Sequence, residues 1–471
     1  MARIADRIGT LGSDLGDAVS GALFDQTIRL GITGLSRAGK TVFITSLVAN
    51  LMDRARMPGL VGADVISAAF LQPQPDDTVP RFDYENHLAA LTGPTPYWPE
   101  GTKAVSELRL SFRLRPRGLL GGLRGARRLH LDIVDYPGEW LLDLTLMEKS
   151  YAEWSAETLS RLESRSDTAP PEAAAYRAAV MATDPAAPLD EPQAQALARA
   201  FTGHLQAARA AGWSDCTPGR FLLPGELAGS PVLTFAPLPQ PEPCPRGCLW
   251  REMERRYEVY KAKIVRPFFR DHFAKIDRQV VLLDVLGALH HGPAALEDMR
   301  RTMAQILTAF RPGKTAWLAS LLGGKKVERI LFAATKADHL HQNQHTKLTA
   351  ILAALLRDAR DRADFAGADT AAMAIASLRT TVEETRPTRG ETLDMVRGHL
   401  PGGKQAAFYA GDLPADPARL LAPARQGAAD WPQDRFQAMD FAPAPLHLRP
   451  GEGPPHIRLD RAAQFLIGDL L

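Results

Sequence analysis

The feature that most constrains this chain is a phosphate-binding loop close to its N-terminus. The loop fits the pattern G-x-x-x-x-G-K-[ST] through Gly34, Gly39, Lys40 and Thr41. An apolar strand that begins at Ile28 leads into the loop, and an apolar helix leaves it. That order aims a helix N-terminus and several backbone N–H groups at one point, which suits a polyphosphate. The sequence therefore predicts a nucleotide site on an α/β fold.

The polar residues of this segment have expected roles. Lys40 would reach the β- and γ-phosphates of a nucleotide, and the Thr41 hydroxyl would bind Mg²⁺. Two stretches of similar composition, at 398–404 and 313–315, have no strand leading into them, and we interpret both as loops. The residues predicted to contact the nucleotide in this segment are Gly34, Ser36, Arg37, Ala38, Gly39, Lys40, Thr41 and Val42.

A second motif predicts a nucleotide-sensitive switch. The apolar strand 129–134 is followed by Asp135-Tyr136-Pro137-Gly138, which matches the D-x-x-G pattern of GTPases. We expect Asp135 to hold the Mg²⁺ shell and Gly138 to give its N–H to a γ-phosphate. The tetrapeptide alone is also typical of an ordinary turn. Its place after a strand and downstream of the phosphate loop favours the switch.

A third motif points to the base. The apolar strand 329–334 is followed by Thr335-Lys336-Ala337-Asp338, which matches the guanine-reading pattern [NT]-K-x-D. The Asp338 carboxylate can accept hydrogen bonds from both N1–H and the N2 amino group of guanine. Adenine offers neither donor there and would leave the carboxylate without a partner. The free-energy cost is large enough for the site to discriminate between adenine and guanine. The aliphatic stem of Lys336 can lie over the base plane.

The segments between these motifs predict the fold class. Residues 280–285 form an apolar run typical of a strand inside a parallel sheet, and residues 106–114 alternate like an edge strand. A last strand, 373–376, precedes Ser377 and Leu378, whose backbone N–H groups we expect near the base. We predict an α/β fold with a doubly wound, mostly parallel sheet that binds its ligand at the carboxyl ends of the strands.

An all-helical insertion is predicted directly after Gly138, because the chain from there to the next strand is far longer than a common connection. Its helices are expected at 141–166, 172–183, 190–212 and 250–276. The predicted organisation is an N-terminal amphipathic helix (1–26), a GTPase domain in two parts (27–139 and 278–400) around the insertion (140–277), and a C-terminal extension (401–471) whose helix packs back on the sheet.

Composition bounds the partners and the compartment. The net charge is only +2 with charges of both signs, so we expect no nucleic acid partner. Three cysteines are a sparse and odd set, which argues for a reducing compartment. No apolar run reaches the roughly 18–20 residues of a transmembrane helix. Two segments leave a peripheral membrane contact open. The first is the helix 1–26, for which docking on the protein itself is the alternative. The second is an arginine-rich hairpin over 113–128, for which a solvated turn is the alternative.

Taken together, the motifs, their order and the helical insertion resemble the YcjX-like family of bacterial P-loop GTPases over essentially the full length of the chain. The most specific part is the run D-Y-P-G-E-W-L-L over 135–142, whereas the motifs at 34–41 and 335–338 are shared by many GTPases. The resemblance implies that GTP is bound and hydrolysed to GDP with Mg²⁺ in the cytoplasm, with a link to stress responses and to the inner membrane. It does not identify the partner; a protein effector that contacts the insertion is our expectation.

Three positions carry open questions about mechanism. Glu139 stands where many GTPases place a glutamine, and an ionised carboxylate is repelled by a triphosphate. It could act as a base, point away or hold a partner. Arg37 is hypothesised to supply in cis the charge of an arginine finger, the alternative being that it faces solvent or an acidic partner. Thr102 is chosen over Thr78 and Thr92 as the switch threonine that binds Mg²⁺.

The predicted function is a slow regulatory GTPase whose catalytic residues are Lys40, Arg37, Gly138 and Glu139. Two alternatives remain from other classes of protein. A scaffold that binds GTP without cleaving it is suggested by Glu139. A P-loop ATPase or kinase is disfavoured by the motif at 335–338.

Overall fold

A computed structural model of the chain describes residues 25–34, 38–102, 104–115, 127–165, 170–308, 327–365, 367–388, 391–426, 431 and 436–471. Several predicted features lie outside these residues. They are nearly all of the amphipathic helix 1–26, the tip of the arginine-rich hairpin, the stretch 313–315, and Ser36 and Arg37 of the phosphate loop.

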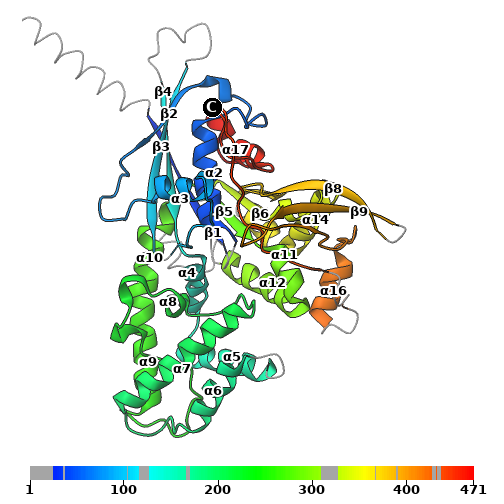
Figure 1. The fold of residues 1–471 in the computed structure, drawn as a ribbon. Coiled ribbons are helices and arrows are strands. Elements are labelled where there is room, and N and C mark those ends of the chain that lie inside the picture. Colours follow the sequence, from blue (N-terminus) through cyan, green and yellow to red (C-terminus); the bar gives the residue numbers. More distant parts are fainter. Residues whose placement is uncertain are drawn as a thin grey trace, which may run out of the picture.

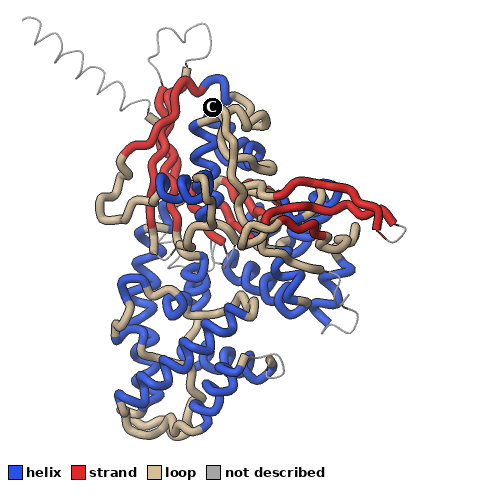
Figure 2. Tube along the Cα trace, viewed as in Figure 1, coloured by secondary structure: helices blue, strands red, loops and turns tan. Residues whose placement is uncertain are grey.

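Within the described residues, a seven-stranded sheet forms the centre of the fold, with strand order β2-β3-β4-β1-β5-β6-β7 (Figures 1 and 2). Its strands are β1 (Gln26–Gly34), β2 (Ile66–Gln72), β3 (Ser106–Leu114), β4 (Arg127–Asp135), β5 (Arg278–Leu283), β6 (Arg329–Ala334) and β7 (Asp369–Ala374). The last five in spatial order pair in parallel, and β2 and β3 pair antiparallel with their neighbours. The predicted α/β class with a mostly parallel sheet is confirmed.

The helices outside the insertion lie against the sheet or beside it. They are α2 (Lys40–Met52), α3 (Tyr84–Thr92), α11 (Val285–His291), α12 (Pro293–Thr308), α14 (His345–Leu355), α15 (Arg357–Phe365), α16 (Ala418–Gln426) and α17 (Leu459–Ile467). Both faces of the central strands are buried, as their continuous apolar sequence requires. In β5, Val280 and Leu282 join one core with α2 and α17, whereas Val281 and Leu283 join the other.

A helical lobe lies beyond one end of the sheet, between β4 and β5 in the sequence (Figure 1). Its helices are α4 (Gly138–Leu142), α5 (Tyr151–Ser164), α6 (Pro171–Met181), α7 (Glu191–Ala210), α8 (Gly219–Leu222), α9 (Leu249–Tyr260) and α10 (Arg266–Asp271). Aromatic rings fill its centre, with Trp154 stacked on Tyr257 at 5.0 Å between centroids. The lobe shares one continuous apolar core with a face of the sheet, so it is packed on the sheet rather than tethered to it.

Three details of the sequence-based fold were wrong or incomplete. Residues 106–114 are not an edge strand, because β2 covers their outer side. β2 escaped prediction because its residues are mostly half-buried and carry little periodicity. A second, three-stranded antiparallel sheet was also missed, formed by β8 (Thr381–Thr388), β9 (Glu391–His399) and β10 (Gln405–Phe408).

The C-terminal helix α17 packs back on the sheet. Leu459, Ala462 and Leu466 are buried in the same core as α2. At the end of this segment, the Asp469 carboxylate accepts hydrogen bonds from the buried Arg278 guanidinium at 2.6 and 2.8 Å. Among the residues described, no helix is both long enough and apolar enough to cross a lipid bilayer.

Replacing Leu466 with alanine tests how strongly α17 holds the sheet. The side chain is 1% exposed, so its loss leaves a cavity and is expected to lower the free energy of unfolding by about 2–5 kcal/mol. Arg461→Ala, on the exposed side of the same helix, is the control and should change that free energy by less than about 0.5 kcal/mol. Denaturant titration measures both; equal effects would contradict the docking of α17.

Candidate nucleotide site

One cavity of about 820 Å³ lies where β1, β6 and β7 end, bounded also by the first turn of α2 and the last turn of α7. Its size is that of a pocket for a nucleotide-sized molecule. The predicted site residues in its wall are Gly34, Ala38, Gly39, Lys40, Thr41, Val42, Thr102, Glu139, Thr335, Lys336, Asp338, Ser377 and Leu378. Five segments that are distant in the sequence therefore meet at one place.

The phosphate side of the cavity is formed by the turn between β1 and α2. Gly39 adopts the left-handed conformation (φ 78°) immediately before Lys40, the first residue of α2. No side chain of the described residues caps this helix, so its first N–H groups are available to an anion. Gly34 lies so close to β5 that a β-carbon there would be 2.9 Å from the Leu282 carbonyl oxygen. The geometry brings backbone donors and Lys40 to one end of the cavity.

Oxygen ligands gather beside this end. The Thr102 hydroxyl donates a hydrogen bond to Asp135 Oδ2 at 2.6 Å, and the Thr41 hydroxyl faces the Glu100 carbonyl at 3.4 Å. Asp135 is buried, and its Oδ1 has no hydrogen-bond partner among the residues described. Burial raises the pKa of Asp135, against the lowering effect of Lys40 and Thr102. Two hydroxyls and a buried carboxylate with a spare oxygen fit a hard cation such as Mg²⁺.

The opposite end of the cavity carries the residues predicted to read the base. Asp338 is 4% exposed, and its Oδ2 accepts hydrogen bonds from the backbone N–H of Thr380 at 2.9 Å and from its hydroxyl at 2.8 Å. Lys336 has the left-handed backbone conformation (φ 60°), and its ammonium group contacts Asp284 at 2.5 Å. Both side chains are thus fixed by residues that no motif indicated, Thr380 and Asp284.

The switch motif lies between the phosphate loop and the helical lobe. A β-carbon at Gly138 would be 1.8 Å from the Gly34 carbonyl oxygen, so only glycine fits there without displacement. The next residue, Glu139, is buried and forms an ion pair with Arg209 of α7 at 2.6 Å. Gly138 and Asp135 do not themselves line the large cavity. Asp135 is hydrogen-bonded to Thr102, which does line it.

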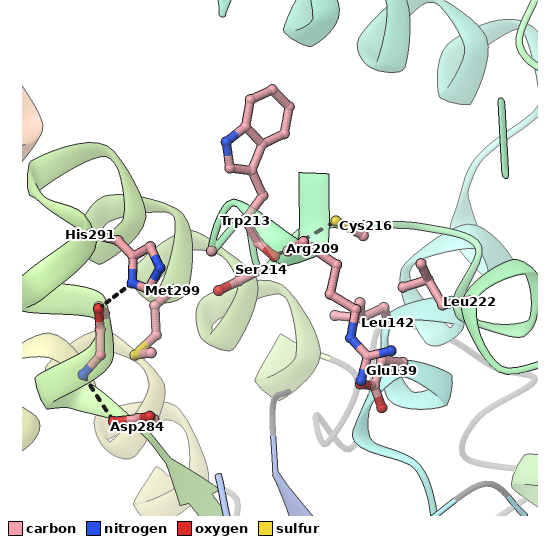
Figure 3. A pocket seen from close by; sticks show the side chains of 14 residues that line it. Glu139, Leu142, Arg209, Trp213, Ser214, Cys216, Leu222, Asp284, His291 and Met299 are labelled. Carbon is pink, nitrogen blue, oxygen red and sulfur yellow. Dashed lines mark hydrogen bonds and ion pairs between the residues drawn. The ribbon is translucent and has the colours of Figure 1, made fainter. Parts of the chain in front are cut away.

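A smaller cavity of about 80 Å³ lies behind Glu139, at the junction of α4, α7, α11 and α12 (Figure 3). Arg209 and Glu139 border both cavities. Figure 3 shows the Arg209 side chain reaching from the end of α7 toward Glu139. The lobe therefore contributes a side chain to the wall of the nucleotide-sized cavity.

The junction between switch and lobe is polar as well as close. A β-carbon at Gly219 would lie 1.9 Å from the Glu139 carbonyl oxygen. Asp143 accepts hydrogen bonds from the Gly219 N–H at 2.7 Å and from the Tyr260 hydroxyl at 2.5 Å. Burial raises the pKa of Asp143 to about 6, although these donors oppose the rise. The Arg220 guanidinium lies over the Trp140 ring at 3.1 Å.

Several residues in the cavity wall were missed by the sequence analysis. They are Trp98, Gln206, Arg209, His339, Thr380, Asp440 and Phe441. The Trp98 indole N–H donates to the Phe441 carbonyl at 2.8 Å, and His339 packs edge-on against the Phe441 ring at 5.1 Å. These contacts connect the loop before Thr102 to the C-terminal extension across the cavity. The residues belong to no local pattern, so only the folded chain reveals them.

The chain is similar to known proteins over most of its length. A model of the YcjX-like family, DUF463, matches residues 28–471. A protein of Escherichia coli (strain K12) named Ras-like GTPase YcjX is 36% identical over 462 residues, covering 95% of this chain and 96% of the relative. A protein of the same name from Shewanella oneidensis is 35% identical over 478 residues, covering 95% of each chain.

The raised pKa of Asp143 predicts a pH dependence of stability. Because the folded state holds this proton more tightly than the unfolded state, the free energy of unfolding falls as the pH rises from about 4 through about 6. Asp143→Asn keeps an acceptor and removes the titration. Between pH 5 and pH 7.5, the free energy of unfolding should fall by about 1 kcal/mol less in Asp143→Asn than in the wild type. Denaturant titration at the two pH values measures this; identical pH dependence would contradict it.

Proposed function

This chain belongs to the YcjX-like family, and from that premise we propose that it is a regulatory GTPase. It binds GTP and Mg²⁺ at the carboxyl edge of the sheet and hydrolyses GTP slowly to GDP and phosphate. The observation that carries the proposal is that residues of the phosphate loop, the threonine segment and the guanine motif line one cavity together with Glu139, which directly follows the switch motif. The names of the relatives, Ras-like GTPase, agree with it.

Guanine is the base that fits the Asp338 end. Thr380 holds one carboxylate oxygen, and each carboxylate oxygen accepts more than one hydrogen bond. The carboxylate therefore keeps the capacity to accept from N1–H and the N2 amino group of guanine. Adenine would place the acceptor N1 against a buried carboxylate and is rejected for that reason. The stem of Lys336, held at its head by Asp284, would cover the base plane.

The triphosphate fits the other end. Lys40 and the first N–H groups of α2 would bind the β- and γ-phosphates. Thr41, Thr102 and Asp135 would hold Mg²⁺, the last through its spare oxygen or through water. Bound Mg²⁺ would neutralise part of the negative charge on the β- and γ-phosphate oxygens. These are the same three metal ligands that the sequence predicts.

The helical lobe would report which nucleotide is bound. A γ-phosphate that attracts the Gly138 N–H would shift the backbone of Gly138 and Glu139. This backbone is in near contact with Gly34 on one side and with Gly219 of the lobe on the other. Packed backbones transmit such displacements because they cannot be compressed. The partner that we propose is a protein effector that contacts the lobe in one nucleotide state. The cysteines, free in the structure, are consistent with a cytoplasmic setting.

Asp338→Asn tests the guanine assignment. The amide presents a donor where guanine also donates, so the affinity for GTP should fall by at least about a hundredfold, while xanthosine triphosphate, which has an acceptor at C2, should gain. Titration with fluorescent nucleotide analogues measures both affinities, with Asp412→Asn, an exposed aspartate, as the matched control.

The same titration, with single-turnover hydrolysis, separates the alternatives. Unchanged selectivity for GTP in Asp338→Asn would contradict the base assignment. Equal binding of ATP and GTP by the wild type would indicate an ATPase or kinase. Tight GTP binding without cleavage would indicate a scaffold.

Gly219→Ala tests the coupling of the lobe to the site. Its β-carbon would collide with the Glu139 carbonyl, so α4 must shift and the affinity for GTP should fall about tenfold or more, a loss above about 1.4 kcal/mol. Gly203→Ala, in α7 of the same lobe, is the control, because a β-carbon there meets no atom within 4 Å. Equal affinities of the two variants would show that the lobe is not coupled to the site.

A further inference from the structure

The last turn of α7 places a guanidinium at the switch end of the cavity. Arg209 lies in the helical lobe, yet its side chain forms part of the cavity wall and reaches the residue that follows the switch glycine (Figure 3). Gln206, one helical turn earlier, borders the same cavity. The lobe thus presents a cation and an amide, from one helix face, to the region where the γ-phosphate would lie.

The ion pair with Glu139 fixes where this charge sits. Glu139 has 8% of its side chain exposed, and Arg209 has 30%. An unpaired carboxylate there would repel a triphosphate, so Arg209 removes an obstacle to binding by neutralising it. The guanidinium carries its N–H donors in a planar fork that suits phosphate oxygens as well as carboxylates. Arg209 can therefore exchange Glu139 for a γ-phosphate.

Hydrolysis of GTP is accelerated by positive charge beside the γ-phosphate. Water attacks the γ-phosphorus, a new P–O bond forms, and the bond to the oxygen that bridges the β- and γ-phosphorus breaks, with the electron pair leaving on GDP. The proton of the attacking water ends on the released phosphate or in solvent. Negative charge grows on the transferred group and on the bridging oxygen, and an arginine that contacts them stabilises the transition state.

We propose that Arg209 is the arginine finger of this GTPase, supplied in cis by the helical lobe and held by Glu139. The inference rests on the proposed function and deepens it. It also explains why docking of the lobe would matter for catalysis, because Arg209 reaches the site only while the lobe is packed on the sheet. An effector that displaces the lobe would therefore change the rate of hydrolysis. Arg37, to which the sequence analysis assigned a finger in cis, lies outside the described residues and stays the second candidate for this role.

The test compares Arg209→Ala, Arg209→Lys and Arg37→Ala with the wild type. Arg199→Ala is the matched control, an exposed arginine on the same helix. For each protein, GDP affinity, single-turnover GTP hydrolysis and binding of the GDP–aluminium fluoride complex are measured. We expect Arg209→Ala and Arg209→Lys to lose at least about a hundredfold in hydrolysis and to lose aluminium fluoride binding, while GDP affinity stays within about threefold. Arg199→Ala should match the wild type.

A second comparison separates catalysis from support of Glu139. If Arg209 only positioned Glu139, removing it from a Glu139→Gln protein would cost nothing further. A finger predicts the opposite: Arg209→Ala should still lose hydrolysis and aluminium fluoride binding in that background. Retention of both in Arg209→Ala would overturn the inference, above all if Arg37→Ala lost them. Failure of the wild type to bind GTP would instead overturn the proposed function, and GDP and GTP affinities show which of the two has failed.

Discussion

The rest of the site depends on the close approach of three backbones. The end of β1 at Gly34, the switch at Gly138 and Glu139, and the start of α8 at Gly219 lie so near one another that β-carbons at the two later glycines would come within 2 Å of carbonyl oxygens. No side chain separates the sheet from the switch, or the switch from the lobe. Side chains can change rotamer and absorb a displacement, but backbones in contact cannot. A shift of the switch therefore has to be shared with the lobe.

Buried charge makes this docking specific. Asp143 is satisfied by the lobe through Gly219 and Tyr260. On the sheet side, Asp298 of α12 accepts from Arg165 at 2.6 Å and from the Ser214 N–H at 2.5 Å, and burial raises its pKa to about 6. Such carboxylates add little net stability, because desolvation offsets their attraction to cations and donors. An undocked lobe would leave Asp298 without these partners, so one arrangement of lobe and sheet is favoured over others.

Sequence analysis predicted correctly those features that depend on residues close together in the sequence. The strands β1, β4, β5 and β6 and the α/β class follow from apolar runs, and Gly39 and Lys40 follow from the geometry that a phosphate turn imposes. It failed where the determinant is tertiary. β2 is mostly half-buried, so it carries no clear period, and its presence means that 106–114 is not the edge of the sheet. Thr380 holds the side chain of Asp338, and Asp284 holds that of Lys336. No sequence motif relates either pair by its spacing.

The cavity is assembled from parts that a minimal nucleotide-binding sheet does not have. The sheet brings Lys40 and Asp338 to opposite ends, the lobe adds Arg209, and the C-terminal extension adds Phe441, which the loop residue Trp98 holds by a hydrogen bond. A nucleotide bound here would contact all three parts at once, and its binding energy would be shared among them. Release of either added part would weaken the hold on the nucleotide without altering a motif residue. For this reason, residues that tune affinity and rate in this chain are to be sought on the segments that close the cavity as well as in the motifs.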